Sequence, residues 1–585
     1  MSDDEPRYDA RHKPVPSRYG AHPLRPERQR PAWLIPAAAL VGVLALVAVV
    51  VGAGVFGGGS GGSPTAVPSD VAALPSQTAP ADSPSSSDGD TSASQSPGES
   101  ESPSASPDAP AQLVDTEVAI VPVTNFRSPL SSVKPIDVRA LVAGSTAFDH
   151  VVLVDADADA VLDAVKLDRG ALGKKLKTVA SPQALAKYLS KHRSDLGFLR
   201  ADDVRPSVRA LGWGKSSLFG GDRVPSLAAW PLKATLQVPE GQQPAYDPAR
   251  AWTMVAGGDI LLDRGVKLAI DGHGSGTDFP FNGGTVDITG TCKNCSPMGW
   301  DTAYTRRTGN AGAFRDLTKG ADIAIANFEN PAPDDWRFHP SGTVFSANPA
   351  NIAALQDAGF DWVSMANNHI GDAGDNGILQ TMKNLNKHDI AHSGAGKNTK
   401  AAHKASLIKA GGVTVGLLGY DTIAPSYWSA SDSPGSAHMT VGALKRDIAR
   451  ARAAGADMVV VMPHWGIEYT ARPTALQQKL GRAAIDAGAD MVIGNHPHWV
   501  GAMEVYKGKP IWYAMGNLVF DQSWSIPTEE GITVENTFDG TRLVQSRMRP
   551  HLILDRAQPN LMDPAGDGKA VLKQLYKASG SLLPW

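Results

Sequence analysis

The sequence predicts an α/β protein in which a largely parallel sheet is covered by helices. Helix-like segments stand between several apolar runs; NPANIAALQDAG, for example, ends at Gly359, a typical helix stop. Strands that are apolar on both faces, with helices between them, indicate a sheet covered on both sides. The strand-like runs are TMVAGG (253–258), ADIAIAN (321–327), WVSMAN (362–367), VTVGLLGY (413–420), MVVVMPH (458–464), MVIGNH (491–496) and IWYAMGN (511–517).

Composition excludes some functional classes. The chain has 585 residues, a formal net charge of −4 and 42% hydrophobic residues. That length suits two or three domains, and that apolar fraction is sufficient for a large core. The mixed, slightly acidic charge provides no basic patch for nucleic acid.

The N-terminal part predicts a membrane anchor. The segment from Trp33 to Phe56 carries no charged residue and is long enough to cross a bilayer as a helix. Arg25, Arg28 and Arg30 precede it, and positive flanks stay on the cytoplasmic side. We therefore expect residues 1–32 in the cytoplasm and the rest of the chain outside the cell. A cleaved signal peptide is the alternative, although the apolar run is long for one and no clear cleavage site follows.

Composition also divides the remaining chain. Residues 57–112 are rich in Gly, Ser, Pro and acids, which predicts a disordered linker. Residues 113–245 alternate strand-like and helix-like segments and predict a small α/β domain, which resembles a solute-binding fold only weakly. Residues 250–555 carry the strongest signals. In the tail, 556–585, AVLKQLYKAS predicts a short helix.

The chain holds two cysteines, Cys292 and Cys295, in TCKNCSP. A single C-x-x-C outside the cell is consistent with a small disulfide, half of a metal site or a redox pair. No second pair completes a zinc cage, so a local disulfide that fixes a loop is the favoured interpretation.

Polar side chains follow several of the strand-like runs. In open α/β sheets, ligands gather beyond the carboxyl ends of the strands. Carboxylate, amide and imidazole groups at one edge suit zinc, manganese or iron better than calcium. His496 and His498 flank Pro497, and they would straddle a bridged centre only if the loop twists there. The polar residues at strand ends are Asp259, Asn327, Glu329, Asn367, Asn368, His369, His464, His496 and His498.

The order of these motifs resembles the CapA family of poly-γ-glutamate capsule synthesis proteins. The resemblance covers roughly residues 252–525 and rests on GGDILLDR, ANFEN, MANNHIGDAG, PHWGIEY, GNHPHWVG and YAMGNLVFDQ. It implies a variant of the calcineurin-like metallophosphatase fold, a two-sheet sandwich flanked by helices.

The resemblance also implies roles for individual residues. Asp259 and His498 would bind one divalent metal ion, and Glu329 would bridge to a second. His369 matches the position of a general acid that protonates a leaving group, and Asp259 would also be part of the catalytic centre. The second metal would be held by Asn368, His464 and His496.

One position departs from the metallophosphatase pattern. Leu261 stands where a first-motif histidine is expected, so the first site is one ligand short and the centre holds either one or two metals. Arg264 is a candidate to bind an anionic substrate group. Glu468 and Asp521 are candidates to orient the imidazoles, although Glu468 could equally cap a helix.

These observations lead to three functional hypotheses. The first is a membrane-anchored, metal-dependent hydrolase or transferase that acts outside the cell on an anionic polymer such as poly-γ-glutamate, or on a phosphoester. The second is a non-catalytic accessory protein that binds the polymer and assists a membrane synthase in export. The third, a solute-binding module in residues 113–245, has no specific motif in its favour.

Overall fold

The computed structural model describes residues 112–144, 148–241 and 244–585. The predicted cytoplasmic tail, anchor and most of the linker lie outside the described residues. Within the part of the chain that is described, no helix has both the length and the apolar character needed to cross a membrane.

Residues 113–239 form a small α/β domain around one sheet. Its strand order is β4-β3-β5-β1-β6, and β8 extends it by pairing with the long β1. The helix α3 (Ala158–Val165) follows β3, and α5 (Pro182–Leu189) begins at Ser181, whose hydroxyl caps it. The strands are β1 (Leu113–Asn125), β3 (Val151–Val154), β4 (Leu176–Val179), β5 (Leu196–Arg200), β6 (Val208–Ala210) and β8 (Lys233–Pro239).

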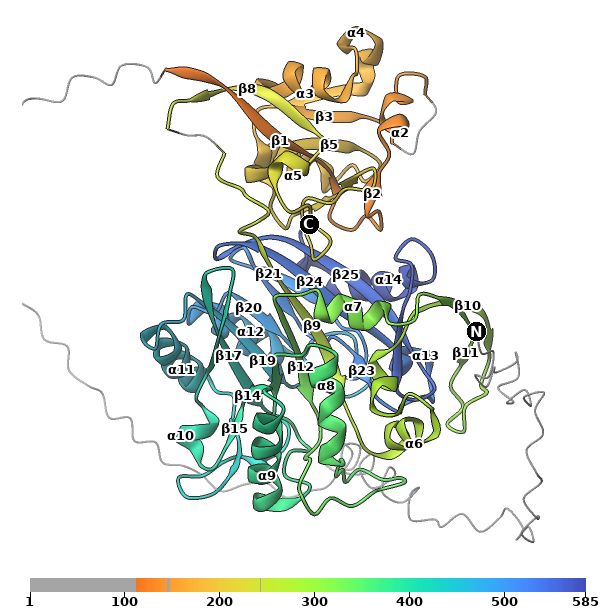
Figure 1. The fold of residues 1–585 in the computed structure, drawn as a ribbon, viewed down its shortest axis with the longest axis vertical. Coiled ribbons are helices and arrows are strands. Elements are labelled where there is room, and N and C mark those ends of the chain that lie inside the picture. The colour runs from red at the N-terminus through yellow and green to blue at the C-terminus, as the bar shows by residue number, and fades with distance from the viewer. Residues whose placement is uncertain (1–111, 145–147, 242–243) are drawn as a thin grey trace, which may run out of the picture. The chain divides into compact units, whose positions relative to one another are not determined.

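The second part of the described chain contains a ten-stranded sheet in the order β11-β10-β26-β25-β24-β9-β12-β13-β14, with β23 paired to β9 (Figure 1). The strands β9, β12, β13, β14 and β23 run parallel. Its members are β9 (Trp252–Ile260), β10 (Thr285–Cys292), β11 (Thr302–Gly309), β12 (Ile323–Phe328), β13 (Trp362–Ser364), β14 (Ala391–Ser393), β23 (Asn517–Val519), β24 (Glu530–Asp539), β25 (Arg542–Leu554) and β26 (Gln558–Leu561).

A six-stranded sheet has the order β16-β17-β19-β20-β22-β21. Its central strands β17, β19, β20 and β22 are parallel, and antiparallel strands close both edges. Its members are β16 (Ser406–Ala410), β17 (Val413–Asp421), β19 (Met458–His464), β20 (Met491–Ile493), β21 (Met503–Tyr506) and β22 (Lys509–Trp512).

The two sheets pack face to face over one apolar core. Ile323 and Ile325 of β12 belong to the same buried cluster as Val460 and Met462 of β19. Each such side chain contributes about 1.5–3 kcal/mol when it is fully buried. Because successive residues of a strand point to opposite faces, the intervening Ala324 and Ala326 belong to a different cluster.

Helices cover the outer face of each sheet (Figure 1). On the ten-stranded sheet these are α6 (Arg264–Gly272), α7 (Ala313–Lys319), α8 (Ala353–Asp357) and α9 (Gly374–Lys387). On the six-stranded sheet they are α11 (Val441–Ala453) and α12 (Ala475–Asp486), the latter starting with a capping box formed by Thr474 and Gln477. The predicted α/β class is confirmed, and the described chain forms a helix-flanked two-sheet sandwich.

The sheets are mixed, which differs from the largely parallel sheet expected from the sequence. Parallel strands occupy the positions of the apolar runs, but β24 and β25 pair antiparallel across Asp539 and Arg542. The strand β26 and the helix α14 (Gly568–Ser579) then follow, and Val571, Leu572 and Leu575 of α14 pack into the core between the sheets. Residues after 555 therefore complete the large domain.

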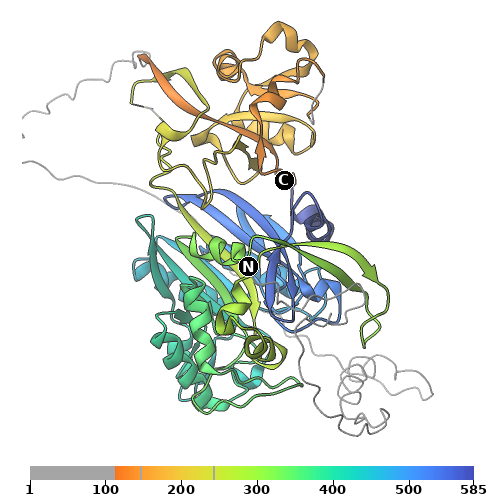
Figure 2. The same ribbon diagram turned by 45° about the vertical axis from the view of Figure 1, so that its right-hand side comes forward.

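The strands β10 and β11 form a hairpin at the edge of the ten-stranded sheet (Figure 2). Cys292 at the end of β10 is bonded to Cys295, so the pair forms the local disulfide favoured from the sequence.

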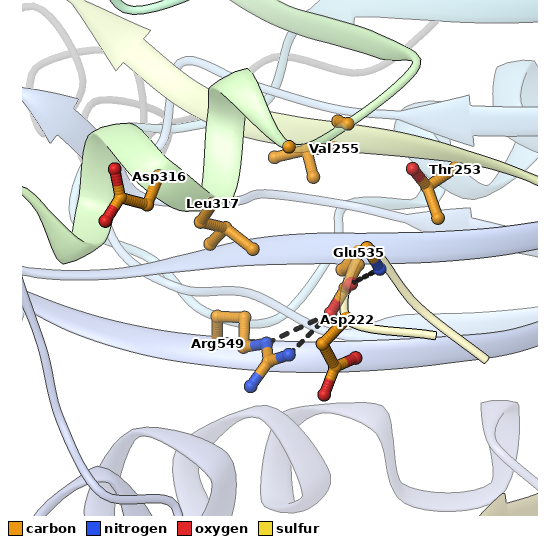
Figure 3. Close-up of a pocket in the computed structure, with 10 residues that line it drawn as sticks. Asp222, Thr253, Val255, Asp316, Leu317, Glu535 and Arg549 are labelled. Atoms are coloured by element: carbon orange, nitrogen blue, oxygen red, sulfur yellow. Dashed lines mark hydrogen bonds and ion pairs between the residues drawn. The ribbon is translucent and has the colours of Figure 1, made fainter. Parts of the chain in front are cut away.

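A cavity of about 270 Å³ lies beside β24 and β25, where residues 221 and 222 meet the ten-stranded sheet (Figure 3). In its lining, Glu535 accepts a 2.6 Å hydrogen bond from Arg549 and a 2.7 Å hydrogen bond from the backbone of Gly221. Asp222 accepts from Arg547 at 2.7 Å. These pairings give the cavity a structural explanation.

Candidate metal centre

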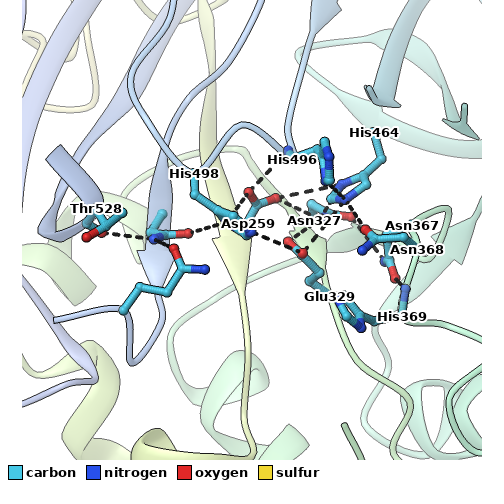
Figure 4. A network of polar contacts seen from close by, with 12 residues as sticks. Asp259, Asn327, Glu329, Asn367, Asn368, His369, His464, His496, His498 and Thr528 are labelled. Atoms are coloured by element: carbon cyan, nitrogen blue, oxygen red, sulfur yellow. Dashed lines mark hydrogen bonds and ion pairs between the residues drawn. The ribbon is translucent and has the colours of Figure 1, made fainter. Parts of the chain in front are cut away.

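The polar side chains predicted at strand ends meet where both sheets end (Figure 4). Asp259 stands near the end of β9, Glu329 directly follows β12, and His464 closes β19. Their exposed fractions are 0%, 0% and 1%. Since β9 and β12 pair in parallel, with Asn327 opposite Asp259, the loops that follow both strands begin at the same edge.

Two groups of buried ligand atoms share Glu329. One group contains Glu329, His464 and His496, and the other contains Asp259, Glu329 and His498. Within each group the ligand atoms lie within 4.8 Å of one another. A carboxylate common to both groups is the arrangement found where one residue contacts two cations.

Asn368 extends the first group. Its Oδ1 lies 2.7 Å from Nε2 of His464. The same Nε2 lies 3.1 Å from Nδ1 of His496 and 3.7 Å from Oε1 of Glu329. An amide oxygen, two imidazole nitrogens and a carboxylate oxygen therefore stand within reach of one another, and this donor set suits zinc, manganese or iron.

The loop between β20 and β21 twists at both of its histidines. His496 has φ 94° and His498 has φ 57°, values that residues other than glycine rarely adopt. In an extended segment these two side chains, one residue apart, would point the same way. The twist instead places His496 in the group with His464 and His498 in the group with Asp259. The backbone N–H of His496 also donates to Oδ2 of Asp259 at 3.2 Å. Strain of this kind persists where the surroundings enforce it, often at functional sites.

Burial dominates the electrostatics of the centre. It raises the pKa of Glu329 well above its usual value, and the negative charge of Asp259 raises it further. It lowers the pKa of His464 and His496 well below theirs, with the neighbouring histidines as the next cause. Both imidazoles are therefore neutral near pH 7 and can donate lone pairs to a cation.

The residues present fit a divalent cation. Oε1 of Glu329 is buried and has no hydrogen-bond partner among the described residues. A buried carboxylate oxygen without a partner is strongly unfavourable. That oxygen lies 3.7 Å from Nε2 of His464 and 3.7 Å from Nε2 of His498, so a cation between them would satisfy it.

Asn327 connects the two groups and was not selected as a site residue from the sequence. Its Nδ2 donates to Oδ1 of Asp259 at 2.7 Å and lies 3.2 Å from Nδ1 of His464. Asn367 in turn donates to Oδ1 of Asn327 at 3.3 Å and to the backbone oxygen of Phe328 at 2.8 Å. The signal was present, because Asn327 and Asn367 both close strand-like runs.

Asn517, at the start of β23, orients His498. Its Oδ1 lies 2.8 Å from Nδ1 of His498. Its Nδ2 donates to Oε1 of Gln522 at 3.0 Å and to the backbone oxygen of Thr528 at 2.9 Å, which fixes the direction of the amide. The Nδ1 of His498 therefore carries the proton, and its Nε2 is left for the centre. No sequence pattern assigned this role to Asn517.

His369 lies beside the centre and is held by Asp372. Its Nδ1 is 2.9 Å from Oδ2 of Asp372. The same carboxylate accepts from the Tyr427 hydroxyl at 3.0 Å and from the backbone N–H of Phe345 at 2.9 Å. The Phe345 ring lies against the imidazole, with centroids 4.0 Å apart. These contacts fix the orientation of His369, and the H-x-x-D spacing was the available sequence signal for Asp372.

Arg264 and Asp521 pair with each other. Oδ1 of Asp521 accepts from Nε of Arg264 at 3.1 Å, and Oδ2 accepts from the backbone N–H of Gly265 at 2.9 Å. Arg264 also donates to the backbone oxygen of Gly342 and lies over the Phe345 ring at 4.7 Å. The structure thus places the predicted anion-binding residue in a buried ion pair, and the partners of Asp521 are Arg264 and Gly265.

Glu468 is exposed and stands next to Tyr469. Burial first, and then this neighbouring carboxylate, raise the pKa of the Tyr469 hydroxyl. The group beside Glu468 is therefore the Tyr469 phenol and not an imidazole.

Leu261, at the departure from the metallophosphatase pattern, is fully buried in a small apolar cluster with Phe345 and Phe520.

This chain is similar in sequence to bacterial capsule synthesis proteins. The family described as "Bacterial capsule synthesis protein PGA_cap" matches residues 253–522, which include all the proposed ligands. The capsule biosynthesis protein CapA of Bacillus anthracis is 30% identical over 342 residues, covering 57% of this chain and 75% of that protein. The PGA biosynthesis protein CapA of Bacillus subtilis is 35% identical over 219 residues, covering 36% of this chain and 56% of that protein.

Among solved structures, a 5'-nucleotidase precursor from Thermus thermophilus is similar at 14% identity and a TM-score of 0.32, covering 56% of this chain and 58% of that one. That score is too low to support an argument about this chain. The sequence relatives are sufficient: with 30% identity over three quarters of the Bacillus anthracis protein, this chain belongs to the CapA family of bacterial capsule synthesis proteins.

Proposed function

We propose that this CapA-family protein is a metal-dependent hydrolase or transferase in the synthesis of poly-γ-glutamate or a related anionic capsule or envelope polymer. The observation that carries the proposal is the pair of buried ligand groups that share Glu329. The names of the relatives, capsule and PGA biosynthesis proteins, support the polymer and the pathway. Residues 250–585 would be the working part.

The two ligand groups define what each would hold. Asp259, Glu329 and His498 would hold one divalent ion, and Glu329 would be shared with a second site completed by Asn368, His464 and His496. When bound, such an ion polarises a carbonyl or phosphoryl oxygen and supplies a hydroxide nucleophile near neutral pH. Leu261 adds no donor to the first group, so we expect that site to bind its ion more weakly.

His369 would protonate the leaving group. Its Nδ1 is 2.9 Å from Asp372, so the proton available for transfer is on Nε2. Asp372 acts as a positioning residue, because its hydrogen bonds with Tyr427 and with the Phe345 backbone keep the carboxylate directed at the imidazole. The ring of Phe345 limits the rotation of His369 and excludes water from one of its faces.

The proposed location is the outer side of the cell membrane. The apolar segment from Trp33 to Phe56 would anchor the chain, with residues 1–32 in the cytoplasm. The Gly-, Ser- and Pro-rich residues 57–112 would give the folded domains reach toward a polymer or a membrane synthase.

An accessory role is the second candidate, and Leu261 favours it. A first site that lacks one ligand is consistent with a centre that binds polymer and does not cleave it. In that case the protein would assist a membrane synthase in export. Amide and phosphoester cleavage make the same demands on the centre, so a metallophosphoesterase is a third outcome that the assay must distinguish.

The test uses the full chain purified in detergent. Metal content would be measured first, and hydrolysis of poly-γ-glutamate and of bis(p-nitrophenyl) phosphate would be assayed next. His369→Asn should retain metal and lose turnover, whereas His388→Asn, a histidine whose imidazole lies beside the Gln356 side chain, serves as the matched control. Bound metal without turnover on either substrate would leave the accessory role, and turnover on the phosphodiester alone would establish the phosphoesterase.

A further inference from the structure

A row of aromatic side chains leads away from the candidate metal centre. The ring of Tyr469 lies 6.1 Å from the ligand His498, between centroids. Trp499 follows at 6.4 Å from Tyr469, and Trp300 lies 5.9 Å from Trp499. Trp524 also lies 6.4 Å from Tyr469. The row therefore begins at a buried ligand and ends at a tryptophan that is 42% exposed.

The turn between β10 and β11 holds Trp300 in place. The disulfide between Cys292 and Cys295 closes the start of this turn. The backbone N–H of Trp300 donates to Oγ of Ser296 at 2.9 Å, and the backbone N–H of Ser296 donates to the oxygen of Trp300 at 3.1 Å. The exposed ring is thus carried by a cross-linked turn with its own hydrogen bonds.

The turn is also fastened to the wall of the site. Asp301 accepts from the backbone N–H of Asn294 at 3.0 Å through its side chain, and from that of Ile526 at 3.2 Å through its backbone oxygen. Ile526 opens α13 (Ile526–Glu529), and the oxygen of Thr528 in the same helix holds Asn517. The helix that supports the ligand His498 therefore also positions Trp300.

The fold leaves part of the Trp300 ring uncovered, since this residue is 42% exposed. A large exposed aromatic ring contributes little to folding, and its presentation on a rigid turn reduces the entropy lost when a ligand stacks on it. The neighbouring Trp499 has a covered indole N–H with no acceptor among the described residues, a feature that calls for an explanation.

The charge along the row selects the chemistry of the ligand. The face of an aromatic ring is electronegative, and the exposed Glu468 carboxylate stands beside Tyr469. Both repel the carboxylates of a polyanion. A sugar ring suits the row, because it offers an uncharged face of C–H groups for stacking and hydroxyls for hydrogen bonds to a carboxylate.

We propose that Trp300 and Trp499 form a subsite for a hexose or hexosamine ring of a glycan, adjacent to the metal centre. The inference rests on the proposed function in one respect, that the neighbouring centre is where the polymer is processed. It adds a second ligand class: a glycan is held on the aromatic row beside the centre that processes the anionic polymer.

The test measures binding, so it requires neither turnover nor metal. The full chain, in a detergent without a sugar headgroup, would be titrated with a β-1,4-linked N-acetylglucosamine hexamer, with cellohexaose and with poly-γ-glutamate, by calorimetry. We expect at least one of the two glycans to bind, and we expect Trp300→Ala to reduce the affinity for that glycan by about tenfold or more. Trp300→Phe should retain binding within about threefold, since a stacking face remains.

Two controls separate the subsite from general effects. Met298→Ala removes another exposed apolar side chain of the same turn, 59% exposed, and should leave glycan affinity unchanged. Replacing both Cys292 and Cys295 by serine should weaken glycan binding by several-fold, because the turn is no longer cross-linked.

The proposal is overturned if neither glycan binds, or if Trp300→Ala binds glycan as tightly as the unaltered chain. It is also overturned if Trp300→Ala weakens the binding of poly-γ-glutamate alone, because the row would then serve the anionic polymer. Metal content of each variant is measured separately. If Trp300→Ala keeps the metal content of the unaltered chain but loses glycan binding, the subsite is supported. If the unaltered chain itself contains no metal, that result bears on the proposed function and not on the subsite.

Discussion

Oδ1 of Asn517 lies 2.8 Å from Nδ1 of His498, and the other end of the same amide is bonded to Gln522 and to the backbone of Thr528. The amide therefore cannot turn without losing two hydrogen bonds. A histidine of the candidate metal centre is thus oriented by Asn517, and this orientation depends on the helix α13 through the backbone oxygen of Thr528.

Asn517→Leu should weaken metal binding without removing a ligand. The leucine preserves volume but cannot accept from His498, so the imidazole is free to rotate or change tautomer, and such losses reduce metal affinity by about 10–100-fold. The affinity would be measured by titrating the metal-free protein with Zn²⁺ and Mn²⁺ against a chelating indicator. Gln522→Leu, which removes only one bond from Nδ2 of Asn517, should have a smaller effect; an equal or larger effect would contradict the role given to Asn517.

The centre was partly predictable from the sequence because parallel strands deliver their carboxyl ends to one edge. Asp259, Glu329 and His464 follow apolar runs that became β9, β12 and β19, so their convergence follows from the class of fold. The specific roles of Asn327 and Asn517 did not follow, although Asn327 closes an apolar run, because an asparagine at a strand end caps or pairs in many ways. Only tertiary packing decides which neighbour it meets.

A twist at His496 and His498 was the stated condition for a shared centre, but the local sequence preferences do not produce it. Positive φ is unfavourable for histidine, and Pro497 disfavours helical backbone before it, so local preferences argue against the observed loop. The surrounding contacts, such as the bond from His496 to Asp259, impose it. In contrast, the hairpin of β24 and β25 carried a recognisable turn signal, because Gly540 opens the two-residue loop between Asp539 and Arg542.

Stability should fall as pH rises from about 5 to 8, because of Glu530. Burial raises the pKa of this carboxyl to about 7, well above its usual value of 4.5, and its residue is 6% exposed. A folded-state pKa above the unfolded one means that the folded state binds more protons between the two values, so stability is greatest below them and decreases as pH rises through the folded pKa. The decrease attributable to this group is on the order of 3 kcal/mol.

Urea unfolding of the metal-free protein at several pH values between 5 and 8.5 would measure this effect. Glu530→Gln keeps the shape of the side chain and removes the titration, so its unfolding free energy should vary less over the same range. A variant with the same pH profile as the unaltered protein would show that Glu530 is not the responsible group.

Asp372→Asn should lower turnover while the metal content stays constant. Nδ1 of His369 now lies 2.9 Å from a carboxylate oxygen, and an amide placed there can reverse the tautomer or release the ring. We expect a reduction in kcat of about 10²–10⁴-fold, the range attributed to a general acid, with KM little changed.

Tyr427→Phe serves as the graded comparison for this prediction. It removes one hydrogen bond to Asp372, the 3.0 Å contact with Oδ1, and leaves the contact with His369 intact. Its effect on kcat should therefore be several-fold at most. A loss of metal in Asp372→Asn would instead indicate a structural role for this residue.

Arg264→Leu should destabilise the fold. The guanidinium pairs with Asp521, donates to the backbone of Gly342 and lies over the Phe345 ring, and its residue is 8% exposed. Breaking a buried ion pair by removing one partner leaves an uncompensated charge and costs about 3–5 kcal/mol. Replacing both Arg264 and Asp521 by leucine removes both charges, so the double variant should recover part of that loss.

Denaturant unfolding of the unaltered protein, the two single leucine variants and the double variant gives the coupling energy between the two residues. A role of Arg264 in substrate binding would show as a raised KM with unchanged unfolding free energy, whereas the buried ion pair predicts a lower unfolding free energy and a positive coupling between the two residues.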